Sequence, residues 1–510
     1  MNDPFPPPGA TRPGRISPEI SLGLSPPASL DTIDDLAIWL RDHAVEEVEC
    51  VTPDFAGIGR GKVMPADKFT RTTPTYLPTS LFFLTITGEY PDFEGFASYD
   101  IDADLALRPD LSTTRAVPWA SDRSVQVIHD VCDRDGNLVE FAPRSVLRRV
   151  LARYEARGWR PIVAPELEFY LTKPNINPDY PLEPPIGRSG RKAQKAQAYS
   201  IAAVDEYDSV IEHIYDYAAA LRLDIDTIIQ EAGAAQLEIN LLHGDPLDLA
   251  DQVFLFKRLI REAALRCGCY ATFMAKPMEG QPGSAMHIHQ SVVVAETGRN
   301  LFSNPDGSAS DAFRHFIGGQ QTYLRAAACL MAPYVNSYRR LVPNMTAPIN
   351  LDWGHDNRTT GLRVPISEPE ARRVENRVVG ADANPYLAIA ASLAAGYLGL
   401  TEQREPRDEV TDDSYNRARE LPYGLLEAID EFNGCAPLRE VLGPGFSDLY
   451  AAVKRHEFEE FMRVISPWGR EDLLLNVGGG AGAAEPGGLP GRAGAAAGGG
   501  CPDLDGGSRC

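Results

Sequence analysis

The heptapeptide PELEFYL, residues 165–171, alternates acidic and apolar side chains and predicts a β-strand with two unlike faces. Successive side chains of a strand point in opposite directions, so Glu166 and Glu168 share one face and the apolar residues pack on the other. Two carboxylates this close repel each other unless a cation or a proton lies between them. The stretch therefore predicts either a charged site on a sheet or the exposed polar face of an edge strand.

The segment ARRVENR, residues 371–377, repeats this period of two with both signs of charge. As a strand it places Arg373, Glu375 and Arg377 on one face. A solvated ladder of ion pairs is the simpler interpretation, because surface ion pairs are common and contribute little stability. The alternative is that these side chains form a second wall of one charged site.

Histidines follow the same alternation in PGSAMHIHQS, residues 282–291, which places His287 and His289 on one face of a strand. The stretch QEAGAAQLEINL supplies two further acids, Glu231 and Glu238. A lone histidine pair can be structural, but beside several carboxylates it becomes a candidate ligand set for a hard metal ion. Ligands that are mostly carboxylate, with one imidazole per ion, suit Mg²⁺ or Mn²⁺ better than Zn²⁺.

Arginines complete the candidate site, since a guanidinium group holds phosphate or carboxylate through two parallel hydrogen bonds. Such a cluster beside divalent ions is what phosphoryl transfer needs, namely neutralised charge and fixed positions. The chain has no Walker, GxGxxG, GxSxG or HExxH motif, which disfavours a P-loop, a Rossmann fold and the corresponding hydrolases. The candidates are Arg340, Arg358, Arg363, Arg373 and Arg377.

The composition of the 510 residues, 44% hydrophobic and 24% charged, is typical of a soluble globular protein. A net charge of −22 disfavours a nucleic-acid partner, because such a surface repels phosphate. No apolar run approaches the roughly 20 residues of a membrane span, and the N-terminus lacks the apolar core of a secretory signal. With eight scattered cysteines, we expect a cytoplasmic protein with reduced thiols and no membrane partner.

Turn residues and apolar periods divide the chain into regions. After a helix over 31–44, strand-like runs such as VEEVECVTPDF, SLFFLTITGEY and SVQVIHDVCD predict a sheet-rich domain. Further helices are expected from Pro143, over 251–266 and over 384–400. The predicted regions are a flexible Pro-rich extension (1–30), an N-terminal domain (31–141), a larger catalytic domain (142–477) and a disordered Gly/Ala-rich tail (478–510).

Seven blocks in a fixed order resemble the signature blocks of the glutamine synthetase family: PELEFY, EAGAAQLEIN, ATFMAKPMEGQPGSAMHIHQS, NSYRRLVP, NRTTGLRVP, EARRVENR and ANPYLAIAA. The resemblance covers roughly residues 31–477. It implies an α+β fold, with a small N-terminal β-grasp domain and a catalytic domain whose curved antiparallel sheet is flanked by helices. It also implies a ring-shaped homo-oligomer, a dodecamer, with active sites between subunits. There ATP activates the γ-carboxylate of glutamate before an amine attacks.

The resemblance implies a role for each candidate residue. His289, Ser291 and Arg373 match nucleotide contacts, and Arg358 and Arg363 match the clamp on the transferred phosphoryl group. Glutamate would be held by Gly283, Arg340 and Arg377. Two ions, Mg²⁺ or Mn²⁺, would be held by Glu168, Glu231 and Glu238 and by Glu166, His287 and Glu375.

The chain departs from glutamine synthetases in the amine pocket. Their RLVPGxEAP motif carries a glutamate, and here RLVPNMTAP places Thr346 at that position. Their DGSS-like motif with an ammonium-site aspartate is also absent, and Glu89 in TITGEYPDFEGF is the nearest acid. Two smaller departures are Pro282 in place of an asparagine and Glu370 in place of a lysine.

Losing two anions disfavours ammonium and makes room for a larger nucleophile. A primary alkylamine still arrives protonated, so we expect Glu89, Asp92 or Glu94 to accept its proton. The variant motifs resemble the γ-glutamylpolyamine branch of the family, in which a diamine such as putrescine attacks. The alternatives are an ammonium-using glutamine synthetase, a ligase for a monoamine such as ethanolamine, a guanidino kinase on the related fold, and an inactive relative, which should have lost metal ligands.

Overall fold

A computed structural model of the chain describes residues 31–71, 74–91, 101–193, 197–474 and 477. The predicted extension and tail, together with Asp92 and Glu94, lie outside these residues. The chain divides into two units, which we describe separately, within residues 1–463 and 464–510. In the second unit α15 (Pro467–Leu473) is capped by the Ser466 hydroxyl, which accepts from the backbone N–H of Gly469.

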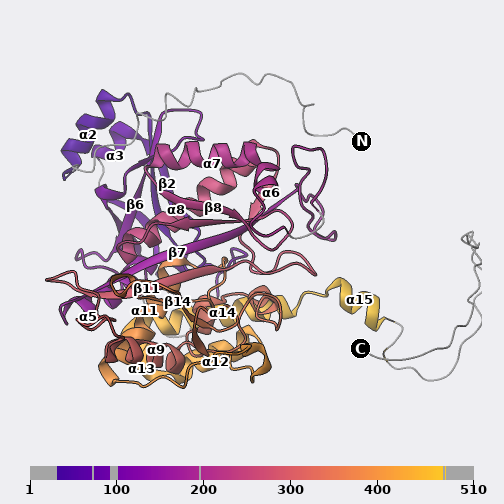
Figure 1. The fold of residues 1–510 in the computed structure, drawn as a ribbon. Coiled ribbons are helices and arrows are strands. Elements are labelled where there is room, and N and C mark those ends of the chain that lie inside the picture. Colours follow the sequence, from indigo (N-terminus) through magenta and orange to yellow (C-terminus); the bar gives the residue numbers. More distant parts are fainter. Residues whose placement is uncertain (1–30, 72–73, 92–100, 194–196, 475–476, 478–510) are drawn as a thin grey trace, which may run out of the picture. The chain divides into compact units, whose positions relative to one another are not determined.

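The first unit contains two sheets (Figure 1). The N-terminal sheet has the order β2-β1-β6-β4-β3, with β5 paired to β6. β1 runs antiparallel to β2 and parallel to β6. Its strands are β1 (Glu47–Pro53), β2 (Gly59–Pro65), β3 (Thr75–Pro78), β4 (Asp104–Pro109), β5 (Arg115–Ala116) and β6 (Ser124–Cys132).

Helices α2 (Ile33–Asp42) and α3 (Ala66–Arg71) cover part of the N-terminal sheet with a small apolar core of their own, which includes Leu36, Val48 and Val125. This arrangement confirms the predicted helix and the strands in VEEVECVTPDF and SVQVIHDVCD. The β-grasp assignment and the boundary at residue 141 stay predictions.

SLFFLTITGEY is not a strand, and that prediction was wrong. Thr79–Phe83 forms a 3₁₀ helix that buries both Phe82 and Phe83, whereas a strand would turn them to opposite faces. A tight turn follows at residues 85–89, in which the Glu89 N–H donates to the Thr85 hydroxyl at 2.9 Å.

The turn at residues 85–89 is anchored on α14 (Pro444–Met462). The backbone N–H of Ile86 donates to the Glu457 carboxylate at 2.8 Å, and Glu457 also pairs with Lys454 at 2.8 Å. Lys454 and Glu457 are both buried. The turn that carries Glu89 is therefore fixed to a helix more than 350 positions later in the chain, since Ile86 and Glu457 are 371 positions apart.

The second sheet has the order β12-β13-β14-β11-β7-β9-β8, with β10 also paired to β7. Its pairs are antiparallel except for β12 with β13, so the predicted antiparallel sheet is confirmed with one exception. Its strands are β7 (Trp159–Thr172), β8 (Ile225–Gln230), β9 (Gln236–Leu241), β10 (Tyr270–Thr272), β11 (Met286–Val294), β12 (Trp353–His355), β13 (Leu362–Val364) and β14 (Val374–Asn376).

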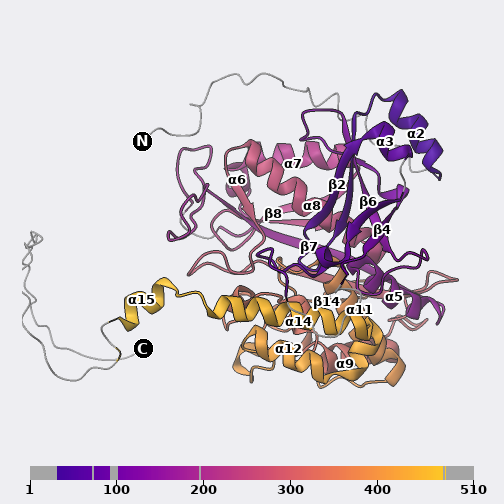
Figure 2. The ribbon, with the colours of Figure 1, turned by 180° about the vertical axis from the view of Figure 1, so that it is seen from behind.

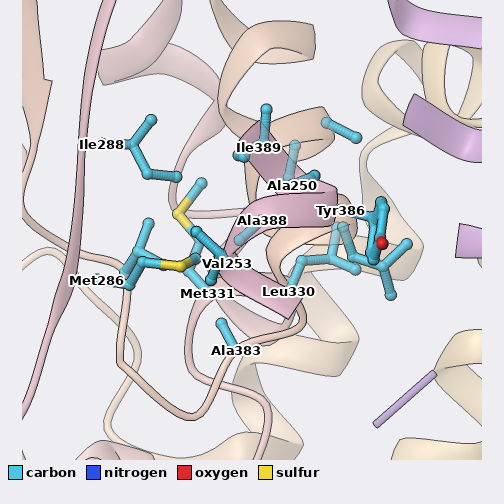
Figure 3. Close-up of a cluster of buried hydrophobic side chains, with 14 of the residues drawn as sticks. Ala250, Val253, Met286, Ile288, Leu330, Met331, Ala383, Tyr386, Ala388 and Ile389 are labelled. Atoms are coloured by element: carbon cyan, nitrogen blue, oxygen red, sulfur yellow. The ribbon is translucent and has the colours of Figure 1, made fainter. Parts of the chain in front are cut away.

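Helices bury the apolar face of this second sheet. Figure 3 shows Met286 and Ile288 of β11 beside Val253 of α8 and Ile389 of α11. The alternation in MHIHQ thus sends the apolar residues to the helices and the histidines to the opposite face. The helices of this part are α5 (Pro143–Glu155), α6 (Ile201–Asp205), α7 (Asp208–Leu221), α8 (Pro246–Arg266), α9 (Asp311–Tyr323), α10 (Ala328–Met331), α11 (Pro385–Glu402), α12 (Leu425–Gly434) and α13 (Ala436–Leu442).

The three predicted helices of the larger domain are confirmed by α5, α8 and α11. α11 is buried along almost its whole length, as its Ala-rich sequence predicts. Figure 2 shows α9, α12 and α14 together on one side of the second sheet, away from α2 and α3. No helix within the described ranges is both long and apolar enough to span a bilayer.

Candidate active site

The register of the second sheet brings the predicted site residues together on one face. β11 lies between β7 and β14, and β9 lies on the other side of β7. Residues opposite each other in neighbouring strands have side chains in contact range. The directly opposed pairs are His287 with Glu166, His289 with Glu375, Glu168 with Glu238, and Arg363 with Glu375.

Two groups of side chains on this face could hold a metal ion. In one, ligand atoms of Glu166, His287 and Glu375 all lie within 4.8 Å of one another. This is the set that the sequence predicts for the second ion. In the other, Glu168 and Glu238 are joined by His287 rather than by Glu231. Carboxylates with a single imidazole suit Mg²⁺ or Mn²⁺, so the donor set fits the expected metal.

Glu231 lies in the loop after β8 and is half-buried. Burial raises the pKa of its carboxyl group, and repulsion from Glu166 adds to the rise. The side chain is therefore within electrostatic reach of the cluster but outside both groups of close ligand atoms. Its role as a ligand stays a prediction.

Glu166 binds both histidines. His289 Nε2 donates to Glu166 Oε1 at 2.8 Å, and His287 Nδ1 donates to Oε2 at 3.3 Å. Burial opposes ionisation of Glu166, but the two hydrogen bonds outweigh it and hold its pKa well below the usual range. Burial also lowers the pKa of His287 to about 4, so the ring is neutral near pH 7 and keeps a lone pair for a metal.

The same face carries carboxylates without matching cations. Burial and repulsion from Glu231 raise the pKa of Glu168 to about 8. Burial and repulsion from Glu166 raise the pKa of Glu238 well above its usual range. A divalent ion would relieve this repulsion. The excess of buried carboxylates therefore favours the binding of such an ion.

Glu375 is neutralised by two arginines. Arg377 Nη1 lies 2.6 Å from its Oε1, and Arg363 Nη1 lies 2.9 Å from its Oε2. Burial would raise the pKa of Glu375, but attraction by Arg377 and the histidines lowers it to about 2. The predicted strand in ARRVENR is short, and Arg373 donates to His289 Nδ1 at 3.2 Å instead of pairing with Glu375.

Arg340 is buried and braces the chain after β14. Its guanidinium donates to the carbonyl oxygens of Val378 at 2.8 Å and Arg377 at 2.9 Å. Gly283 packs directly against it, because a Cβ at this position would lie 2.5 Å from Arg340 Cγ and 2.6 Å from the Ala275 carbonyl oxygen. Only glycine fits here, which agrees with the expectation that Gly283 lies in the loop over the bound glutamate, called the glutamate loop below.

Three further predicted residues lie outside the two groups of candidate ligand atoms. Arg358 is exposed in the turn between β12 and β13 and has no ion pair with any described residue. Ser291 lies on β11 on the same side as the two histidines. Thr346 is exposed with a φ of 66°, a left-handed conformation that is uncommon for threonine.

The structure does not bring Glu89 to the sheet face. Its backbone hydrogen bonds stay within the turn at residues 85–89, which is fixed to α14. The two smaller departures have different surroundings. The Pro282 carbonyl accepts from the Tyr170 hydroxyl at 2.8 Å, and Glu370 is exposed.

Gln236 is a positioning residue, which the strand pattern places on the same face as Glu238 without indicating its role. Its Nε2 donates to Glu168 at 3.1 Å and to the Gly283 carbonyl at 3.0 Å, and its Oε1 accepts from the Gly233 N–H at 2.9 Å. The side chain thus joins a candidate ligand, the glutamate loop and the loop after Glu231. Its position two residues before Glu238 in a strand was the available signal.

Known proteins are similar to this chain in sequence and in fold. Residues 140–473 match the family described as "Glutamine synthetase, catalytic domain". The γ-glutamylputrescine synthetase PuuA of Escherichia coli (strain K12) is 35% identical over 84% of this chain and 92% of its own length. A glutamine synthetase of Pyrococcus horikoshii is 35% identical over 73% of this chain and 81% of its own length.

Two further similarities extend the comparison. A glutamate–isopropylamine ligase of a Pseudomonas species is 30% identical over 84% of this chain and 95% of its own length. The solved structure of ligand-free GmaS has a TM-score of 0.74 at 28% identity and covers 86% of this chain and 99% of that chain. With the geometry of the sheet face, these matches show that the chain belongs to the glutamine synthetase family of ligases that form carbon–nitrogen bonds.

Proposed function

We propose that this protein uses ATP to phosphorylate the γ-carboxylate of L-glutamate and transfers the γ-glutamyl group to a primary amine, with putrescine preferred. The observation that carries the ligase assignment is the acid-rich sheet face, where two sets of metal-ligand atoms lie beside ion-paired arginines. Divalent ions bound there would neutralise phosphate charge. Glu166, His287 and Glu375 would hold one ion, and Glu168, Glu238 and Glu231 the other.

The chain's own side chains have distinct tasks in this proposal. Arg358 is exposed and unpaired among the described residues, so it can reach a transferred phosphoryl group. Arg363 and Arg377 are held in place by Glu375 before substrate binds, which reduces the cost of ordering them. His289, Ser291 and Arg373 would contact the nucleotide, and Gly283 and Arg340 would shape the glutamate site.

The preference for an alkylamine rests on Thr346. A threonine cannot supply the negative charge that stabilises a small bare cation, and Thr346 is exposed to solvent. Two relatives support an alkylamine, because their names specify putrescine and isopropylamine. Ammonium is the competing nucleophile, since glutamine synthetases are also similar.

A substrate panel tests the amine. We expect ADP release from ATP and glutamate to be fastest with putrescine and slower with isopropylamine, ethanolamine and ammonium, with a γ-glutamyl amide detected by mass spectrometry. Thr346→Glu should shift the ratio of rates from putrescine towards ammonium, and Thr346→Ser is the matched control. A preference of the natural protein for ammonium would contradict the amine assignment but leave the ligase assignment intact.

A cytoplasmic, ring-shaped homo-oligomer, a dodecamer, with sites shared between subunits is part of the proposal. The sharing of sites is supported by Glu89, because it lies in a turn fixed to α14 and its backbone hydrogen bonds stay within that turn. In a ring, the turn could serve a neighbouring site. Mixing inactive Glu89→Gln and Glu375→Gln subunits should then restore part of the activity. Full activity of Glu89→Gln alone would remove this residue from the amine site.

A further inference from the structure

A cavity of about 380 Å³ lies between the β1–β2 hairpin and α8, away from the sheet face described above. β2 and α8 lie side by side (Figures 1 and 2). The hairpin contributes Gly57, Gly59 and Gly61 to its wall. At Gly59 a Cβ would lie 3.3 Å from Phe254 Cζ of α8, so side chains at these positions would narrow the space. We call this space the hairpin cavity.

The wall from α8 is a stripe of one helical face. Phe254, Lys257, Arg258 and Arg261 are spaced three and four residues apart and all line the cavity. A helix packed on a sheet normally presents apolar residues along such a stripe. Here three of the four positions carry positive charge, although acids outnumber bases by 71 to 49 in the whole chain.

The hairpin adds two more cations, Arg60 and Lys62. Arg60 is neutralised by Asp54 at 2.8 Å. Arg258 is neutralised by Glu49, the only acid in the cavity wall among the described residues. Asp54 and Glu49 are therefore already bound to two of the five cations of the cavity.

Three cations remain without an ion pair in the described part of the chain: Lys62, Lys257 and Arg261. Lys257 donates to the Ala383 carbonyl oxygen at 2.7 Å. Lys257 and Arg261 both lie over the ring of Phe273, at 5.7 and 5.1 Å from its centroid. Burial and repulsion from Arg261 lower the pKa of Lys257 to about 7, although attraction by Asp382 acts in the opposite direction.

We propose that the hairpin cavity binds a small anion with two or more negative charges, either a phosphate group or a dicarboxylate. Lys257 and Arg261 on one wall and Lys62 on the other would hold it, with the glycine backbone leaving the room it needs. Arginine and lysine are the side chains that recognise such anions in proteins. The site is independent of the proposed ligase function, because it shares no residue with the sheet face.

Calorimetric titration of the full-length protein tests the site, with inorganic phosphate and succinate at constant ionic strength. Binding of phosphate alone identifies a phosphate site, and binding of succinate alone identifies a dicarboxylate site. Arg261→Gln and Lys62→Gln should each weaken the affinity about tenfold, the loss expected for one charge-assisted hydrogen bond. Both side chains are exposed, so these variants should fold.

Two control variants separate this site from other phosphate binding. Arg266→Gln removes an exposed charge from the same helix outside the cavity and should leave the affinity unchanged. Arg373→Gln, on the sheet face, should also leave it unchanged. The proposal is overturned if neither anion binds, if Arg261→Gln and Lys62→Gln bind as tightly as the natural protein, or if Arg373→Gln alone abolishes binding.

Discussion

Two buried clusters of charge in this molecule are built in opposite ways. Around Arg144 of α5, three aspartates converge on one guanidinium, with Asp130 at 2.6 Å, Asp251 at 2.8 Å and Asp110 at 2.9 Å. The Tyr386 hydroxyl also donates to Asp251 at 2.6 Å. We call this the Arg144 cluster. On the sheet face, by contrast, Glu168 and Glu238 face each other across paired strands, and neither forms an ion pair with a described cation.

The contrast separates a structural cluster from a binding site. In the Arg144 cluster every aspartate accepts from the arginine, so the group has its cation within the chain. On the sheet face the pKa of Glu168 is raised to about 8, first by burial and then by repulsion from Glu231. An acid cluster that the fold leaves short of positive charge is one that a ligand must complete.

The largest expected effect is on turnover. Glu375→Gln keeps the shape of the side chain but removes a ligand charge and frees two arginines, so we expect the rate to fall about 1000-fold. The circular dichroism spectrum should stay that of a folded protein. Glu370→Gln changes an exposed acid in the same segment and is the control. An active Glu375→Gln enzyme would show that the sheet face does not carry the chemistry.

The next effect is on stability. Arg144→Met leaves the buried Asp251 without an ion pair and leaves Asp110 and Asp130 with Arg148 alone, and we expect the free energy of unfolding to fall by about 3–5 kcal/mol in urea titrations. Arg148→Met removes a partly exposed neighbour and should cost about 1 kcal/mol or less. Any protein that remains folded should turn over at the natural rate. A large loss of turnover in folded Arg144→Met would erase the distinction between the two clusters.

Mg²⁺ should stabilise the folded protein by binding at the sheet face and not at the Arg144 cluster. At 100 times its dissociation constant, an ion that binds the folded state alone adds about 2.7 kcal/mol, which differential scanning calorimetry detects. We expect this gain in the natural protein and a smaller gain in Glu238→Gln, because the ion at Glu166, His287 and Glu375 would remain. Arg144→Met should keep the full gain, since its cluster lies elsewhere. A gain retained in full by Glu238→Gln would exclude Glu238 as a ligand.

The smallest effect is on the pH dependence of stability without metal. The pKa of Glu168 is about 8 when folded and 4.5 for the ordinary group, so the folded state binds the proton more tightly. Stability should therefore fall as the pH rises from about 4.5 to about 8 in the presence of a chelator. Glu168→Gln should flatten this slope in urea titrations at several pH values. An unchanged slope would assign the titration to another group.

Much of the sheet face was predictable because its residues follow strand periodicity. Glu166, His287 and Glu375 lie on different strands, yet each belongs to a run with alternating character, and the register then places them together. Glu231 was less predictable because it lies in a loop, where no period defines a direction. SLFFLTITGEY has the composition of a strand. A 3₁₀ helix forms instead, because it allows Phe82 and Phe83 both to pack in the same core.

The hydrogen bond between Ile86 and Glu457 connects an early and a late segment of the first unit. A chain shortened before α14 would lose Glu457, which accepts from the backbone N–H of Ile86, together with Lys454, the ion-pair partner of Glu457. Shortened versions of this protein should therefore lose order at their N-terminal side, although the deletion is made at the other end. For protein engineering, a deletion at the C-terminal side of residues 31–463 should therefore be judged by its effect on the turn at residues 85–89.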